Sequence, residues 1–310
     1  MIPVLALVGC TASGKSALAM ELARARGDVE LVSIDSMQVY RGMDIGTAKP
    51  TVAEQAEVRH HLIDLADPAE DFTVARFQAA YEIAVADVAA RGRVPLLVGG
   101  TGLYLQAVLD GLEIPGRYPD VRLEVEAEPD TARLYHRLAG LDPLAAGRME
   151  PTNRRRVVRA LEVTLGAGRP FSSFGPGVDA YPERGHRIIG LRRPRPVIDD
   201  RIAERYQHQV AAGLLAEVEQ LGARPAGMSS TARQALGYKE LLAHVEMGAA
   251  LEECLALANA RTRRFARRQE RWFRRDPRIT WLDVDEKPVV VGDQLLRECQ
   301  AFVDREGGRV

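Results

Sequence analysis

The sequence predicts an α/β protein in which helices flank a parallel sheet and one mainly helical subdomain is inserted. Short apolar runs alternate with longer segments of helical periodicity through the N-terminal third of the chain. This alternation is typical of parallel strands joined by crossover helices. A glycine-rich turn joins the first apolar run to the first helical segment. A proline-rich helical stretch then interrupts the alternation, which indicates an insertion.

Strands are predicted where apolar residues run together between turn signals, and helices where they recur every three to four residues. The predicted strands are 2–8, 30–34, 94–98, 187–193 and 279–285. The predicted helices are 15–26, 73–90, 101–110, 196–221, 231–246 and 250–275. Apolar runs without alternation, such as the first strand, are typical of buried parallel strands.

The stretch from 112 to 185 breaks this rhythm. It is helical in pattern and ends in the turn-rich segment GRPFSSFGPG. Its prolines include Pro115, Pro119, Pro129, Pro143 and Pro151. We therefore expect a core formed by 1–112 and 186–310, and an inserted helical subdomain at 113–185.

The composition of the 310-residue chain is that of an ordinary globular protein, with 46% hydrophobic residues, 27% charged residues and a formal net charge of −1. This excludes the disordered and membrane classes. The apolar N-terminal run is too short to span a bilayer and follows no Lys or Arg, so we expect a cytoplasmic protein without signal peptide or anchor. Cys10, Cys254 and Cys299 are too far apart for a disulfide framework or a Cys-x-x-Cys metal site. Cys10 is expected to be a small buried thiol.

Residues 9–16, GCTASGKS, have the spacing of a phosphate-binding loop and lie between a predicted strand and a predicted helix. Here successive backbone N–H groups and the helix dipole surround an anion. Lys15 adds a mobile positive charge, and the Ser16 hydroxyl suits Mg²⁺. A chance match is disfavoured because the lysine, the serine and both flanking elements are present. We predict a P-loop NTPase-like sheet that holds a di- or triphosphate through Gly9, Cys10, Thr11, Ala12, Ser13, Gly14, Lys15 and Ser16.

Asp35 follows the second predicted strand, at the edge of a parallel sheet where ligands bind. An acidic residue at this place serves as a Mg²⁺ ligand, as a general base, or as a turn residue. Position alone leaves these three roles equally open.

Arginines are concentrated in two segments. Residues 261–278 contain nine arginines against only Glu270 and Asp276, and a second cluster consists of Arg154, Arg155, Arg156 and Arg159. Solvated helices usually alternate the sign of their charges, whereas this density predicts binding to a phosphate backbone. On the first helix the arginines are expected to surround nearly the whole circumference, leaving Phe265, Trp272 and Phe273 as the anchoring face.

Eight segments of the chain together resemble one family. They are GCTASGKS, SIDSMQVYRGMDIGTAKP, HHLIDLADP, VPLLVGGTGLYLQAVLDGL, PTNRRRVVRALEV, RIAERY, ALGYKEL and TRRFARRQERWFRR. In this order they resemble the tRNA dimethylallyltransferases, also called tRNA isopentenyltransferases, over nearly the whole chain. The Cys/His set of the zinc finger in eukaryotic members is absent from the sequence, so the chain resembles the bacterial type.

The resemblance implies transfer of a dimethylallyl group from dimethylallyl diphosphate to N6 of the adenine 3′ of the anticodon, with Mg²⁺ as cofactor. The phosphate-binding loop would then hold a leaving group. Asp35 is implied as the general base, and Thr101 with Lys15 and an arginine as the diphosphate grip. Arg205 is favoured as that arginine over Arg201. For Thr101, a helix N-cap remains a second interpretation; for the two arginines, salt bridges to Asp200 or Glu204 do.

The resemblance also implies a tRNA anticodon stem-loop as the partner of a monomer, with the target adenine flipped out of its stack. The residues implied in tRNA binding are Asp35, Ser36, Met37, Gln38, Thr101, Arg122, Arg155, Arg156, Arg159, Gln234, Gly237, Lys239, Arg268, Gln269, Arg271 and Arg275. Two other classes remain as alternatives: a small-molecule or nucleoside kinase that uses ATP at the same loop, and a non-enzymatic RNA-binding switch of ATPase type.

Overall fold

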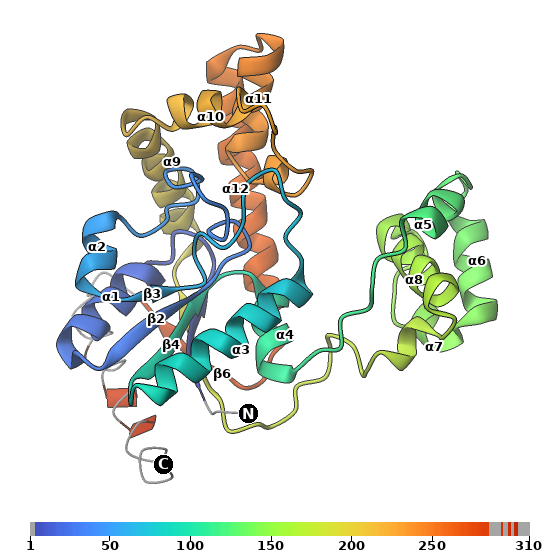
Figure 1. Cartoon of the computed structure of the whole chain (residues 1–310), viewed down its shortest axis with the longest axis horizontal. Helices are drawn as coiled ribbons and strands as arrows, with labels where there is room; N and C mark the ends of the chain where they lie inside the picture. The colour runs from blue at the N-terminus through green and yellow to red at the C-terminus, as the bar shows by residue number, and fades with distance from the viewer. Residues whose placement is uncertain (1–3, 285–292, 294–296, 299–300, 303–310) are drawn as a thin grey trace. The chain divides into compact units, whose positions relative to one another are not determined.

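The structure is a computed structural model that describes residues 4–284, 293, 297–298 and 301–302 (Figure 1). The chain divides into two compact units, one formed by Met1–Leu109 with Glu183–Val310 and the other by Asp110–Pro182. We call them the core and the insertion. The sequence predicts this insertion at 113–185. Cys299 and the last residue of the predicted strand 279–285 lie outside the described residues.

The core contains a parallel sheet with the strand order β3-β2-β4-β1-β5-β6. The strands are β1 (Leu5–Gly9), β2 (Val29–Ile34), β3 (His60–His61), β4 (Val94–Gly99), β5 (Arg187–Arg192) and β6 (Ile279–Asp283). All of the pairs are parallel, and β1 lies in the middle, with Leu5 paired to Leu96 of β4 and to Arg187 of β5. The parallel sheet predicted from the alternating pattern is confirmed.

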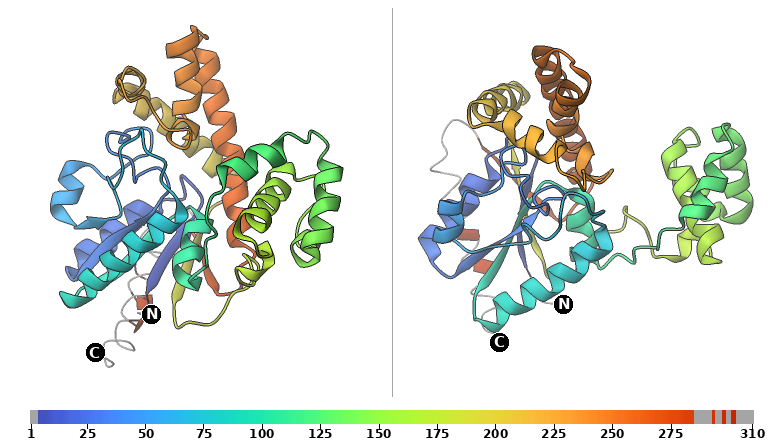
Figure 2. Two further views of the ribbon diagram at one scale, coloured as in Figure 1. Left: turned by 45° about the vertical axis from the view of Figure 1, so that its right-hand side comes forward. Right: turned by 45° about the horizontal axis from the view of Figure 1, so that its top comes forward.

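Helices cover both faces of the sheet (Figure 1), and Figure 2 shows these layers from two further directions. On one face α1 (Lys15–Arg26) packs Leu18 and Leu22 against alternate residues of the strands. The other face carries α3 (Val74–Ala90), α4 (Gly102–Asp110) and the C-terminal helices. Strands buried on both sides explain the apolar runs without alternation.

The C-terminal part of the core is made of α9 (Arg195–Ala211), α10 (Leu214–Gly222), α11 (Tyr238–Met247) and α12 (Leu251–Phe273). The single helix predicted over 196–221 is wrong, because Gly213 adopts a left-handed conformation with φ 100° and separates two helices. The helix predicted over 231–246 begins later, at Tyr238. A short 3₁₀ turn at Ala232–Gln234 precedes it.

Two small elements of the core were not predicted. The helix α2 (Val52–Glu57) begins with a capping box, in which the Thr51 hydroxyl accepts from the Glu54 N–H and the Glu54 carboxylate accepts from the Thr51 N–H. It buries no residue, so it has no apolar periodicity to reveal it. The edge strand β3 has two residues, His60 and His61, which are too few for a strand pattern.

The insertion has a hydrophobic core of its own. It consists of α5 (Pro119–Glu126), α6 (Thr131–Leu141), α7 (Pro143–Gly147) and α8 (Arg154–Ala167). Val125, Leu134 and Leu138 pack there against Val157 and Leu161 of α8. Among the described residues of the whole chain, no helix is long and apolar enough to span a membrane.

Leu138→Ala should loosen the insertion. Leu138 is fully buried in the small core of this unit, and a Leu→Ala truncation of this kind costs about 2–5 kcal/mol in lost burial and cavity formation. Hydrogen exchange should therefore accelerate in 110–182 and stay unchanged in the strands of the core. Leu141→Ala on the same helix is the control, since Leu141 is 44% exposed. Equal exchange rates in the two variants would contradict the separate core of the insertion.

Candidate active site

A cavity of about 320 Å³ opens at the carboxyl ends of β1, β2 and β4. Its lining comes from segments that lie far apart in the sequence and includes Lys15, Asp35, Thr101, Arg205 and Phe265. The structure therefore brings together the four residues implied in catalysis and diphosphate binding. The carboxyl ends of parallel strands next to a change in strand order are the usual binding place of α/β sheets.

The phosphate-binding loop connects β1 to α1 through two left-handed residues, Ala12 with φ 64° and Gly14 with φ 94°. Such a backbone turns successive N–H groups toward one point. The ammonium of Lys15 donates to the Cys10 carbonyl oxygen at 3.3 Å. Burial lowers the pKa of Lys15, while the nearby charge of Asp35 acts to raise it. Ser16 lies exposed in the first turn of α1, on the cavity wall.

Three arginines from the C-terminal half of the core hold this loop. Arg205 of α9 donates to the Thr11 hydroxyl at 2.9 Å, and Arg201 donates to the Ala12 carbonyl at 2.8 Å. Arg193, which sequence reasoning missed, donates to the Ser13 carbonyl at 2.8 Å. In the described part of the chain, Arg201 and Arg205 form no salt bridge with Asp200 or Glu204, so that interpretation of the pair is wrong.

Arg205 differs from the other two because it lines the cavity, where it is half-buried. Its second guanidinium nitrogen donates to the Gly46 carbonyl at 3.3 Å. Burial lowers the pKa of Arg205, and the charge of Asp35 acts in the opposite direction. Lys15 and Arg205 thus place two half-buried positive charges in one cavity, and among the described residues neither has a carboxylate in salt-bridge contact.

Of the three roles that its position left open for Asp35, the structure shows one directly. Its Oδ1 accepts the N–H of Met37 at 2.8 Å and that of Gln38 at 3.4 Å, so it is a turn residue. Its Oδ2 accepts no hydrogen bond from the described residues, and the side chain lines the cavity. Beside it, the Thr101 hydroxyl accepts the Ser36 N–H at 3.3 Å. A free carboxylate oxygen remains for a ligand.

Several residues implied in tRNA binding have their polar groups occupied within the core. The Gln38 amide bonds to the Ser33 hydroxyl and to the carbonyls of Thr47 and Ala48. Gln269 is only 8% exposed and bonds to the backbone of the phosphate-binding loop and of the turn after β4. Gly237 is buried at φ 87°. By contrast, Gln234 and Lys239 lie exposed and bond to each other at 2.7 Å.

Two residues of the cavity lining, Gly46 and Tyr238, are held by a residue that sequence reasoning missed. The carboxylate of Glu217 accepts the N–H groups of Asp44, Ile45 and Gly46. It also accepts the hydroxyl of Tyr238 at 2.5 Å. Glu217 lies about 170 residues after the loop that it holds, and no motif spacing connects the two.

The arginines of α12 do not surround the helix as predicted. Its buried residues are Cys254, Ala258, Thr262, Ala266, Gln269 and Phe273, which form one continuous face. Phe265 and Trp272, expected on the anchoring face, are half-buried at its edges. Arg261 and Arg274 bond to Glu240 and Glu270, which leaves fewer arginines available to a ligand.

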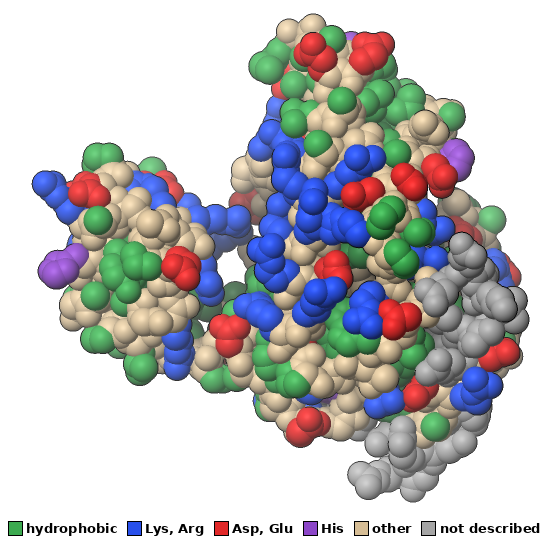
Figure 3. All heavy atoms as spheres, turned by 180° about the vertical axis from the view of Figure 1, so that it is seen from behind, with side chains coloured by type: hydrophobic (Ala, Val, Ile, Leu, Met, Phe, Trp, Pro, Cys, Tyr) green, Lys and Arg blue, Asp and Glu red, His purple; other side chains and the backbone are tan. Residues whose placement is uncertain are grey.

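Four exposed arginines of α12, Arg264, Arg267, Arg268 and Arg271, have no salt bridge to any described residue. Their spacing of three, four and seven residues places them on one side of the helix, and we call them the arginine stripe. Arg268 also lines the cavity, so the stripe reaches the cavity rim. Seen from behind, Lys and Arg side chains gather over the middle of the core (Figure 3).

Within the insertion, most of the basic cluster is engaged. Arg122 and Arg159 contact the buried carboxylate of Glu162 at 3.5 and 2.7 Å. Arg154 donates to the backbone carbonyls of Glu126, Glu128 and Pro129, at the end of α5 and just after it. Arg155 and Arg156 are exposed and form no salt bridge in the described part of the chain. These two are the arginines of the cluster that remain free to bind a phosphate backbone.

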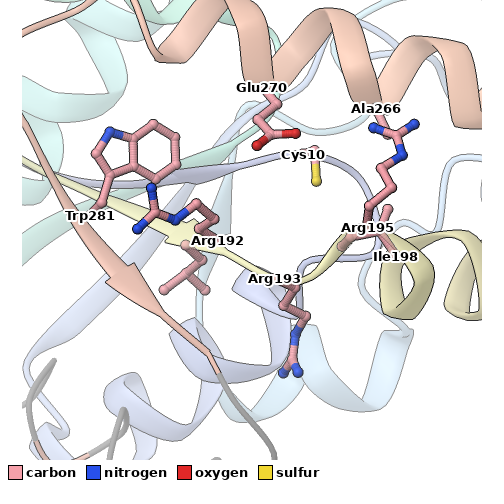
Figure 4. A pocket seen from close by; sticks show the side chains of 9 residues that line it. Cys10, Arg192, Arg193, Arg195, Ile198, Ala266, Glu270 and Trp281 are labelled. Atoms are coloured by element: carbon pink, nitrogen blue, oxygen red, sulfur yellow. The ribbon is translucent and has the colours of Figure 1, made fainter.

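Behind the phosphate-binding loop lies a second cavity of only about 10 Å³ (Figure 4). It is lined by Cys10 together with Arg195 from α9, Glu270 from α12 and Trp281 from β6. Cys10 is 9% exposed, and burial raises the pKa of its thiol. The cavity has room for no more than a water molecule. Cys10 is a structural thiol, as expected from the sequence.

Comparison with known proteins gives one consistent result. The family model for IPP transferase matches residues 38–276. A tRNA dimethylallyltransferase of Nocardioides sp. is 44% identical over 306 residues, which cover 97% of each chain.

Two solved structures are similar over most of the chain. The tRNA isopentenylpyrophosphate transferase of Bacillus halodurans has 37% identity and a TM-score of 0.71, with 99% of each chain covered. A eukaryotic dimethylallyltransferase described as acting on tRNA has 26% identity and a TM-score of 0.76, covering 92% of this chain and 75% of that one. The chain belongs to the IPP transferase family, the tRNA dimethylallyltransferases.

Proposed function

We propose that the protein transfers a dimethylallyl group from dimethylallyl diphosphate to N6 of the adenine that follows the anticodon of tRNA, and releases diphosphate. The observation that carries this proposal is the arrangement of the cavity: Lys15 and Arg205 lie on one wall, and the free Oδ2 of Asp35 faces the same space. Family membership adds the identity of the transferred group.

The cationic wall is suited to a leaving diphosphate. As the bond between the allylic carbon and the phosphate oxygen breaks, negative charge grows on that oxygen. Lys15, Arg205 and the N–H groups at the start of α1 would stabilise this charge without reorganising, because the fold already holds them in place. The hydroxyl of Thr101 would complete the grip on the same side of the cavity.

Besides stabilising the leaving group, the site must remove a proton from the attacking amine. Asp35 keeps Oδ1 on the turn and leaves Oδ2 free, so its orientation is fixed before the substrate arrives. An ordinary carboxylate is a weak base toward a neutral amine. It becomes sufficient here because the amine nitrogen turns acidic as it bonds to the allylic carbon.

A magnesium ion fits the residues present. No group of three or more His, Cys, Asp or Glu that could enclose a metal occurs among the described residues. Mg²⁺ commonly takes only one or two protein oxygens and completes its shell with phosphate oxygens and water. The hydroxyl of Ser16, exposed on the cavity wall, would hold it. The ion would supply further positive charge against the diphosphate.

The second substrate would approach over the arginine stripe. A base stacked in the anticodon loop cannot enter a cavity of about 320 Å³, so the adenine must be flipped out. The stripe borders the cavity at Arg268 and would hold the RNA backbone at this rim. Arg155 and Arg156 of the insertion would contact further phosphates of the stem-loop. With RNA as substrate, we expect a cytoplasmic protein that acts as a monomer.

The donor distinguishes this function from that of a kinase. The protein is incubated with unmodified tRNA and either labelled dimethylallyl diphosphate or γ-labelled ATP. We expect label in tRNA from the allylic donor alone, because the relatives are named for this transfer and the arginine stripe has no use in a small-molecule kinase. Transfer of the γ-phosphate, with no label from the allylic donor, would exclude the proposed function.

Asp35→Asn should separate the two roles of Asp35. The asparagine oxygen keeps the turn bonded to Met37, whereas the base is lost. We expect kcat to fall about 10²- to 10⁴-fold, as for loss of a general base, with RNA binding retained. The kcat of Asp35→Ala should fall by a similar factor or more. A rate close to that of the wild type in Asp35→Asn would reduce Asp35 to a turn residue.

Arg267→Gln with Arg271→Gln should weaken RNA binding and reduce its dependence on salt. Each phosphate contact that is lost lowers the slope of log affinity against log salt by about one. Filter binding of tRNA between low and moderate salt measures both quantities. Arg24→Gln is the matched control, because Arg24 is an exposed arginine paired with Glu57 on the surface of the core. Equal slopes for the control and the stripe variant would remove the stripe from RNA binding.

A further inference from the structure

Gln269 connects two segments that border the diphosphate side of the cavity. Its Oε1 accepts the N–H of Thr11 in the phosphate-binding loop at 2.9 Å. Its Nε2 donates to the carbonyl of Gly100, in the turn after β4, at 2.8 Å. The side chain is 8% exposed, so both bonds are shielded from water. One amide from α12 therefore fixes the spacing between the ends of β1 and β4.

The turn after β4 is built to receive this helix. A Cβ atom on Gly100 would lie 2.4 Å from the Gln269 amide nitrogen, and one on Gly102 would lie 2.3 Å from the Trp272 ring. Real Cβ atoms do not approach this closely, so the Gln269 amide or the Trp272 ring would have to shift if the glycine facing it carried a side chain. The Gln269 amide is therefore packed closely against the turn at Gly100.

The same turns of α12 carry the arginine stripe on their outer side. Arg268 precedes Gln269 and is exposed, and Arg271 follows it two positions later. A packed helix moves as a unit rather than bending at one residue. If a ligand on the arginine stripe shifts α12, the Gln269 side chain shifts with it. The Thr11 N–H, which Gln269 binds, then shifts as well.

We propose that Gln269 is a positioning residue that couples binding of RNA on the arginine stripe to binding of diphosphate in the phosphate-binding loop. The inference rests on the proposed function and gives Gln269 a role other than contact with tRNA. Coupling between two ligands is reciprocal. Bound RNA should therefore raise the affinity for diphosphate, and bound diphosphate should raise the affinity for RNA by the same factor. Substrate would then be held most firmly only when both partners are present.

Calorimetry with inorganic diphosphate and Mg²⁺ tests the coupling without relying on the transfer reaction. Affinity is measured for the wild type and Gln269→Met, each alone and saturated with an unmodified anticodon stem-loop. We expect RNA to tighten diphosphate about fivefold or more in the wild type. In Gln269→Met, diphosphate alone should bind about tenfold more weakly, and the effect of RNA should disappear.

A second variant perturbs the Gln269 amide through its partner in the turn after β4. Gly100→Ala places a methyl group where the Gln269 amide nitrogen lies and should displace it. Its effect on diphosphate affinity should therefore not add to that of Gln269→Met in the double variant. Gln78→Met is the control: Gln78 donates to the Ala107 carbonyl at 2.9 Å, away from the cavity, and its loss should leave the coupling intact.

Three results would overturn the inference. One is a Gln269→Met protein with wild-type diphosphate affinity and wild-type coupling. Another is weaker RNA binding with diphosphate binding unchanged, which would return Gln269 to direct contact with RNA. The third is full additivity of the two substitutions. Failure of the wild type to bind diphosphate at all would instead contradict the proposed function, and the inference with it.

Discussion

The structure depends on how the phosphate-binding loop is held. Its left-handed backbone at Ala12 and Gly14 turns its carbonyls outward, where they need donors. Arg193 and Arg201 supply those donors from 180 and 189 residues further along the chain. Gln269 binds the loop N–H of Thr11 from a distance of 258 residues. A local motif is therefore held in shape by contacts from the C-terminal half of the core.

This dependence explains why the C-terminal half of the core cannot be separated from the chemistry. Lys15 and Arg205 are half-buried without a carboxylate in direct contact among the described residues, and partial burial works against their charge. Like charges held together in a poorly solvated cavity favour an anion strongly. The packing of α9 and α12 offsets the cost of this arrangement, and a bound diphosphate would remove it.

The sequence was sufficient for the phosphate-binding motif and for most of the periodic elements, although it did not show the break between helices at Gly213. The loop at 9–16, the buried strands and Asp35 at a strand end follow from periodicity and motif spacing, and the structure places them together. It was insufficient where a distant partner decides the outcome. Arg122 and Arg159 were expected to bind tRNA, yet both form salt bridges with the buried carboxylate of Glu162. Only the folded structure shows which charged side chains form salt bridges with distant residues.

The helix α12 shows why that distinction matters for function. Nine arginines within 261–278 predicted a helix with arginines around nearly its whole circumference, anchored by Phe265, Trp272 and Phe273. Buried residues at Thr262, Ala266 and Gln269 give it one inner face, and pairing of Arg261 and Arg274 restricts the free charge to one outer stripe. A helix with free charge on one side and a buried amide on the other can contact a long anionic ligand and a small one at once. One helix therefore borders the sites of both substrates, which is what a reciprocal coupling between their binding requires.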